Sequence, residues 1–190
     1  MEPTELMQQA GELFLARLEL VPDGAWNNAT PCPEWSVREV AAHVVNGFAL
    51  VPSLLAHERP DPAQRNRDNL GGSPDQAARA ALKSAVEALS QPGALDVMIT
   101  APAGEMPARM FALVRMADTV IHTWDMSSGA GIDTTIPADL IQAVLAASPP
   151  PFLEGARRAG VFGPAVPVDS DADQQTALLA LYGRRSAGDQ

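Results

Sequence analysis

Residues 36–57 read SVREVAAHVVNGFALVPSLLAH, and this segment carries the clearest helix start in the chain. Ser36 suits the N-cap position. Glu39, three residues later, completes a capping box because its side chain can accept a hydrogen bond from the N–H of the cap. The segment therefore predicts a helix from Ser36 to about His57, ended by the proline pair in residues 59–62.

The faces of this helix follow from a turn of about 100° per residue. His43 falls at the edge of an arc of valine, alanine, leucine and phenylalanine side chains, so it is expected to point inward. Gly47, one turn later on the same stripe, is expected to leave open space. His57 belongs to the opposite, polar sector and is expected to be solvated.

Apolar periodicity and Gly/Pro stops predict the remaining elements. Further helices are expected at residues 4–20, 73–89, 108–126, 137–147, about 152–159 and about 172–183, with extended pieces at 97–100 and 161–168. The helix at 73–89 repeats the first pattern, with Ser73 as N-cap, Pro74 at the first helical position and Gln76 closing a capping box.

Four longer helices followed by a smaller helical tail predict an all-α protein, a four-helix bundle with a short helical C-terminal appendage. With 190 residues the chain is expected to form a single domain. The bundle is expected to span about residues 1–130 and the appendage about residues 131–190.

Composition excludes several classes of function. The formal net charge is -10, from 23 acidic and 13 basic residues, which argues against a nucleic-acid-binding surface. No apolar run reaches the roughly 18 residues of a membrane span, and the acidic first residues differ from a secretory signal, so a cytoplasmic protein is expected. Cys32 is the only cysteine, which excludes a disulfide within the chain. It is expected to be a small buried residue or a loop residue rather than a nucleophile, because no histidine is near it in sequence.

The segment at 108–126 is apolar nearly all round, which predicts a buried helix. Asp118 and His122 are one turn apart and share a face, with Arg115 on the flank. A buried carboxylate needs a cation, a hydrogen-bond donor or a metal as partner.

Two interpretations of these residues compete. In the first, Asp118 pairs with His122 or with Arg115, and His43 is an ordinary core histidine. In the second, Asp118 and His122 present an oxygen and a nitrogen on one face, and His43 from a facing helix completes a three-ligand metal site with an open position.

Three stretches carry a family resemblance: TPCPEWSVREVAAH at 30–43, HTWDM at 122–126, and FGPAVP at 162–167 followed by a leucine-rich helix. They resemble the DinB/YfiT-like metalloenzyme superfamily, in particular the branch related to the N-terminal domain of mycothiol-dependent maleylpyruvate isomerase. The resemblance covers most of the chain and implies a DinB-like four-helix bundle.

The resemblance also implies one divalent metal ion, usually zinc, with nickel or another ion as alternatives, held by His43, Asp118 and His122. Isomerase-like members generally have Glu and DinB-like members His where this chain has Asp118. The shorter side chain is expected to need a backbone shift or a bridging water. Asp125 is expected either to orient a ligand histidine through its free N–H or to make a hydrogen bond at the helix end.

The function implied by the resemblance is a thiol-dependent transferase or isomerase. Its expected partners are mycothiol or a similar low-molecular-weight thiol and a small electrophile, and a homodimer is expected from the family. Activation of water for hydrolysis is a second chemistry open to such a centre. The alternative from another class is a non-catalytic metal-binding, ligand-binding or dimerising bundle with a vestigial site.

Overall fold

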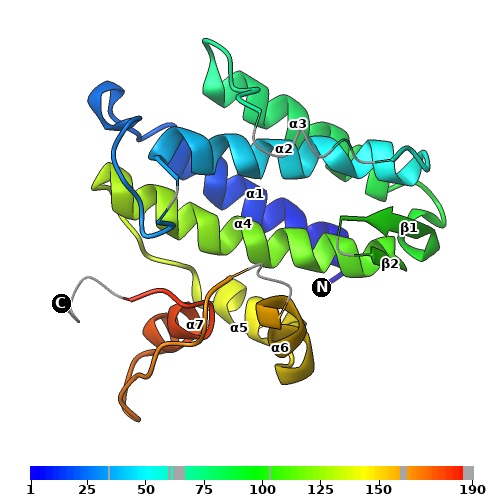
Figure 1. The fold of residues 1–190 in the computed structure, drawn as a ribbon. Helices are drawn as coiled ribbons and strands as arrows, with labels where there is room; N and C mark the ends of the chain where they lie inside the picture. Colours follow the sequence, from blue (N-terminus) through cyan, green and yellow to red (C-terminus); the bar gives the residue numbers. More distant parts are fainter. Residues whose placement is uncertain (34, 60, 62–66, 103, 159–161, 186–190) are drawn as a thin grey trace. The chain divides into compact units, whose positions relative to one another are not determined.

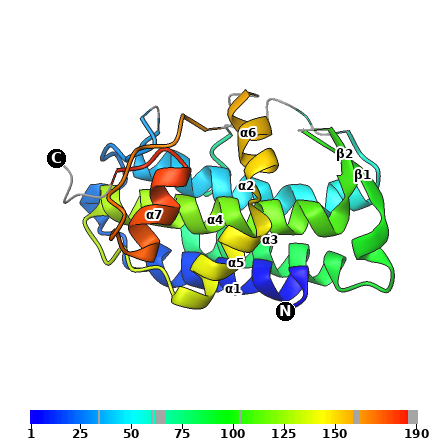
Figure 2. The same ribbon diagram turned by 90° about the horizontal axis from the view of Figure 1, so that it is seen from below.

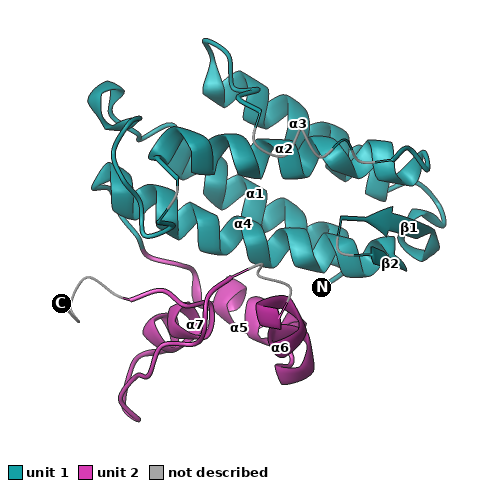
Figure 3. Ribbon diagram, viewed as in Figure 1, with its two compact units in different colours: residues 1–134 teal, residues 135–190 magenta. Residues whose placement is uncertain are grey.

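The computed structural model describes residues 1–33, 35–59, 61, 67–102, 104–158 and 162–185. These residues are mostly helical, with one small antiparallel sheet, which confirms the expected all-α class. Two compact units are present, residues 1–134 and residues 135–190, coloured separately in Figure 3. No helix of the described part combines the length and apolar character needed to cross a bilayer.

The first unit is built on four long helices (Figures 1 and 2): α1 (Pro3–Leu18), α2 (Val37–Leu55), α3 (Pro74–Leu89) and α4 (Ala108–Ala130). Helix α4 packs against α1 and α2, and α3 packs against the same two helices from the other side. Phe14 of α1 and Phe48 of α2, both fully buried, meet edge to face in the core with ring centroids 6.4 Å apart. The closed arrangement brings α2 and α4 side by side, and this pair of helices carries the candidate site.

The start of α2 is the one that the sequence predicts. The Ser36 hydroxyl accepts from the Glu39 N–H, and the Glu39 carboxylate accepts from the Ser36 N–H at 2.8 Å. The corresponding prediction for α3 is wrong in part. Ser73 is the N-cap and Pro74 the first helical residue, but no side-chain capping bond forms at Ser73, whose φ and ψ of -137° and 76° differ from the extended conformation of Ser36.

Helix α4 continues to Ala130, four residues beyond the predicted end. Gly131 ends it with a φ of 68°, the left-handed conformation common just after a helix. The predicted end at residue 126 is wrong, because the helix continues through Ser127, which is buried. This added turn carries Gly129, which contacts the segment leading into α2.

Two short strands, β1 (Met98–Ala101) and β2 (Gly104–Pro107), form the antiparallel pair before α4. The extended piece predicted at 97–100 corresponds to β1, while β2 was not predicted. The 3₁₀ turns are η1 (Asp23–Ala25) and η3 (Ala94–Asp96).

The second unit contains α5 (Ala138–Ala147), α6 (Pro150–Arg158) and α7 (Gln174–Leu181). Helices α5 and α7 contact each other. The hydroxyls of Ser148 and Tyr182 are 2.5 Å apart and buried, and the Tyr182 ring lies 5.0 Å from that of Phe162. The extended piece expected at 161–168 is not a strand in the described residues 162–168, and residue 161 lies outside them.

Candidate metal centre

The packing of α2 on α4 brings His43, Asp118 and His122 together. Each offers one ligand atom, and these atoms all lie within 4.8 Å of one another. His43 Nε2 is 3.3 Å from Asp118 Oδ2, and His122 Nε2 is 3.7 Å from Asp118 Oδ1. The three side chains are between 11% and 18% exposed, so the group is largely shielded from water. The helix faces and the one-turn spacing predicted from the sequence thus agree with the observed meeting of these three residues.

The distances from the carboxylate to the two rings are close to those that a tetrahedral metal ion needs. Bonds of about 2.0–2.1 Å to nitrogen and oxygen at tetrahedral angles place neighbouring ligand atoms about 3.4 Å apart. The Asp118 carboxylate already lies close to that separation from both rings. The expectation that the shorter aspartate needs a backbone shift or a bridging water to reach the ion stays a prediction.

One oxygen of the carboxylate is left without a hydrogen bond. Asp118 Oδ2 is buried and has no hydrogen-bond partner in the described structure. Such an atom is costly unless a cation or donor approaches it. The orphaned oxygen and two nearby imidazole nitrogens form a donor set that suits zinc and related divalent ions.

Electrostatics keep Asp118 ionised. Burial is the largest influence on this group and would raise its pKa. The interaction with Arg115, followed by smaller ones with the rings of His43 and His122, outweighs burial and holds the pKa of Asp118 well below its ordinary value. Burial also lowers the pKa of His43, against the opposing effect of Asp118. At neutral pH the centre therefore offers a carboxylate anion and a neutral His43 ring, the forms that bind metals.

His122 is oriented by Asp125 within α4. Its Nδ1 lies 3.0 Å from Asp125 Oδ2, and Asp125 is fully buried. Since a carboxylate only accepts, Nδ1 carries the proton and Nε2, on the Asp118 side, keeps its lone pair. Of the two roles expected for Asp125, the described contact matches the orienting one.

Arg115 fills the space beside Gly47 that the sequence led us to expect to be open. Its Nη2 is 3.1 Å from Asp118 Oδ1, and its Nη1 would lie 2.3 Å from a Cβ added at Gly47. The ion pair of the first interpretation is thus present together with the ligand geometry of the second. The prediction of a vacant stripe at Gly47 is wrong because the guanidinium from α4 occupies it.

Two further residues of the site were missed. The Trp35 ring lies with its centroid 4.6 Å from that of His43 and 5.4 Å from that of His122, covering both imidazoles. Cys32 offers a sulfur within 4.8 Å of ligand atoms of His122 and Asp125. No histidine is near Cys32 along the sequence, but His122 is near it in the structure.

Loop closure explains these two placements. Ala29 and Ser36 form an isolated antiparallel bridge, and the Thr30 hydroxyl donates to the Trp35 carbonyl at 2.7 Å. The Cys32 N–H donates to the same hydroxyl oxygen at 3.2 Å. Only Thr30 and the two prolines, Pro31 and Pro33, could have signalled a tight turn in this segment.

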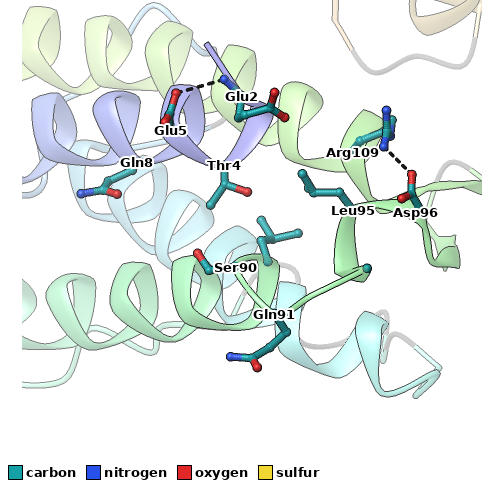
Figure 4. Close-up of a pocket in the computed structure, with 11 residues that line it drawn as sticks. Glu2, Thr4, Glu5, Gln8, Ser90, Gln91, Leu95, Asp96 and Arg109 are labelled. Carbon is teal, nitrogen blue, oxygen red and sulfur yellow. Dashed lines mark hydrogen bonds and ion pairs between the residues drawn. The ribbon is translucent and has the colours of Figure 1, made fainter.

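His57 lies outside the centre, as expected. It is exposed, just beyond α2, with a φ of 58°. Trp124 is 5% exposed, so its side chain belongs to the core. A separate cavity of about 450 Å³, shown in Figure 4, is lined by Glu2, Arg109 and nine other residues, none of which belongs to the candidate centre.

A family model described as the mycothiol maleylpyruvate isomerase N-terminal domain matches residues 7–127, a span that includes all three candidate ligands. The chain belongs to this family. The resemblance seen in the sequence is thereby confirmed. Two relatives of this family member are uncharacterized proteins of Mycobacterium tuberculosis, MT0763 of strain CDC 1551 / Oshkosh and Rv0738 of strain ATCC 25618 / H37Rv. Each is 31% identical over 148 residues, covering 78% of this chain and 78% of the relative.

Two crystal structures of mycothiol-dependent maleylpyruvate isomerase, one of them of a point mutant, share the fold of this family member. Both superpose with a TM-score of 0.58, at 19% and 20% sequence identity. The match covers 74% of this chain and 65% of the isomerase chain. The chain thus spans a little under two thirds of the isomerase's length, and the likeness confirms the DinB-like helical fold.

Proposed function

We propose that this chain binds one divalent metal ion on His43, Asp118 and His122, with zinc as the first candidate and nickel or another ion as alternatives. The observation that carries this proposal is the spacing of the three donors, 3.3 Å and 3.7 Å from carboxylate to each ring. The orphaned, buried Oδ2 of Asp118 supports it independently. Three protein ligands leave one coordination position for an external ligand, the pattern of catalytic rather than structural zinc.

The reaction class that we propose is a thiol-dependent transfer or isomerisation, with mycothiol or a similar thiol as cosubstrate and a small electrophile as second reactant. The family name supports a thiol-dependent enzyme. A bound zinc ion would supply a thiolate at neutral pH by lowering the pKa of a coordinated thiol. Asp125 keeps His122 in the tautomer that leaves Nε2 free, and Trp35 shields both rings from water.

A second candidate is a non-catalytic metal-binding or ligand-binding bundle. The Arg115–Asp118 ion pair favours it, because this contact partly satisfies the buried carboxylate without any metal. The chain also spans only 65% of the isomerase that it resembles in fold. In the metal-binding form of this second candidate, the proposed ligands are the same.

Elemental analysis of protein purified without added metal tests the metal proposal. We expect close to one equivalent of a transition metal in the unmodified chain and none in His43→Ala or Asp118→Ala. His57→Asn is the matched control, since asparagine tolerates the positive φ of this exposed position. Absence of metal in the unmodified chain, with no uptake on titration, would refute the proposal.

Thiol conjugation separates catalyst from binder. The metal-loaded protein is mixed with mycothiol or a simpler thiol and a panel of electrophilic alkenes, and thiol consumption is followed. Turnover that disappears in His122→Ala supports the enzyme. Metal loading without turnover across the panel would favour the binding role.

Two further expectations belong to this proposal. A reduced thiol cosubstrate requires a reducing compartment, so we place the protein in the cytoplasm. The homodimer implied by the family is tested by sedimentation analysis of the full chain.

A further inference from the structure

The Arg115 guanidinium is built into the candidate centre rather than lying on its rim. Its side chain is 13% exposed and stands one turn before Asp118 on α4. Nη2 contacts Asp118 Oδ1 at 3.1 Å, and the guanidinium carbon lies 5.5 Å from the centroid of the Phe111 ring. This largely buried cation is held on two sides, by a carboxylate and by an aromatic ring.

Gly47 makes this placement sterically allowed. A Cβ at this position would come within 2.3 Å of Arg115 Nη1 and 3.4 Å of its Cζ. Any larger residue on this turn of α2 would push the guanidinium away from Asp118. The glycine in one helix and the arginine in the other therefore act as a pair, and together they fix a positive charge beside the carboxylate.

The contacts of Arg115 are incomplete without a further negative group. Its Nε is buried and has no hydrogen-bond partner in the described structure. Only one oxygen of Asp118 is engaged by Arg115, which leaves Oδ2 for another cation. A carboxylate has about four lone-pair positions, so the guanidinium can stay in place when a metal ion binds.

The consequence is a balance of charge at the centre. The charges of Asp118 and Arg115, whose side chains meet at 3.1 Å, cancel each other. A divalent ion bound there keeps an uncompensated positive charge that Asp118 alone would have reduced. In a site shielded from water this excess attracts an anion much more strongly than it attracts a neutral ligand.

We propose that Arg115, seated on Gly47, is a specificity-determining residue that makes the open position of the metal-loaded centre select an anionic sulfur ligand over a neutral one. The inference rests on the proposed function and names what the site prefers there. The charges of Asp118 and Arg115 cancel each other before the ligand binds. The negative charge of the ligand is therefore neutralised by the metal ion and by no other group.

The test uses the full chain loaded with Co²⁺, whose absorption spectrum reports the fourth ligand. Binding of 2-mercaptoethanol (as thiolate) and of imidazole (neutral) is titrated at one fixed pH. In Arg115→Met we expect thiolate affinity to fall about tenfold while imidazole affinity changes by less than about twofold. Equal ratios of the two affinities in the unmodified chain and in Arg115→Met would overturn the inference.

Further variants separate charge from packing. Arg115→Lys keeps the charge and is expected to restore most of the thiolate preference, whereas a packing role would be lost in both substitutions. Gly47→Ala keeps Arg115 but displaces its guanidinium, and is expected to shift the ratio in the same direction as Arg115→Met. Arg38→Met is the control, because Arg38 pairs with Asp68 on the surface. Circular dichroism shows that each variant is folded.

The failure of the metal proposal and the failure of the inference about Arg115 give different experimental results. If neither the unmodified chain nor Arg115→Met takes up Co²⁺, the metal proposal is wrong and this inference falls with it. If both take up Co²⁺ and the thiolate preference is unchanged, the metal centre stands and only the role of Arg115 is overturned.

Discussion

Nδ1 of His122 lies 3.0 Å from Oδ2 of Asp125, one turn along the same helix, and Asp125 is fully buried. The contact fixes both the ring plane and the tautomer of His122, so that Nε2 faces Asp118.

Replacement of Asp125 with Asn should weaken metal binding about tenfold or more, because the amide can still accept a hydrogen bond but lacks the charge that supports the ring. Isothermal titration of the metal-free protein with Zn²⁺ measures the effect. Asp23→Asn, at an exposed turn, serves as the control. Unchanged affinity in Asp125→Asn would show that Asp125 only holds the helix end.

Tryptophan fluorescence should report occupancy of the centre through Trp35. Its ring is in contact with both imidazoles, at centroid distances of 4.6 and 5.4 Å. Co²⁺ or Ni²⁺ is expected to quench the emission, and Trp35→Phe should remove most of that quenching. Trp26→Phe should retain it, because Trp26 contacts Arg38. Equal quenching in the two variants would contradict the placement of Trp35 over the site.

Gly129→Ala should destabilise the protein despite placing a better helix former in α4. The added Cβ would lie 2.8 Å from the Ala29 carbonyl oxygen and 2.9 Å from Thr30 Cγ2, in the segment that carries Trp35. Overpacking of this kind costs about 1–3 kcal/mol, more than the gain in helix propensity of about 1 kcal/mol. Urea denaturation measures the change in the free energy of unfolding.

The control for this substitution is Gly24→Ala, where the added Cβ meets nothing within 4 Å. Its effect should stay within about 0.5 kcal/mol. Stabilisation by Gly129→Ala would mean that the loop at Ala29 does not lie against α4.

Acidification should destabilise the metal-free protein in two steps. The pKa of His43 is lowered in the folded state, so the unfolded chain binds more protons, and stability falls as the pH drops below about 6.5. The pKa of Asp118 is also lowered, so its contribution is full above about pH 4 and is lost on further acidification.

Urea unfolding at several pH values between 7.5 and 4.5 tests the first step. His43→Asn should flatten the dependence between pH 7 and 5, whereas His57→Asn should leave it unchanged. If stability of the unmodified protein rises as the pH falls through this range, the environment deduced for His43 is wrong.

Local rules predicted well which residues lie together at the candidate site. The periodicity of α2 separated inward His43 from exposed His57, and the spacing of one turn placed Asp118 and His122 on one face. These conclusions need only the geometry of a single helix, which the sequence specifies through apolar spacing and a capping box. The C-terminal end of α4 and the capping of α3 were less well predicted, because a serine can serve as a helix stop or sit buried within a helix.

The sequence by itself therefore determined the class of fold, the faces of α2 and α4, and the three residues that meet between them. Only the tertiary structure decided what surrounds those residues: Arg115 in the space at Gly47, Trp35 over the imidazoles, and Cys32 near His122. The physical reason is how far apart along the sequence the interacting residues lie. A helical face is set by residues within a few positions of one another, whereas these contacts depend on how closely α2 and α4 approach and on how the loop between residues 29 and 36 closes.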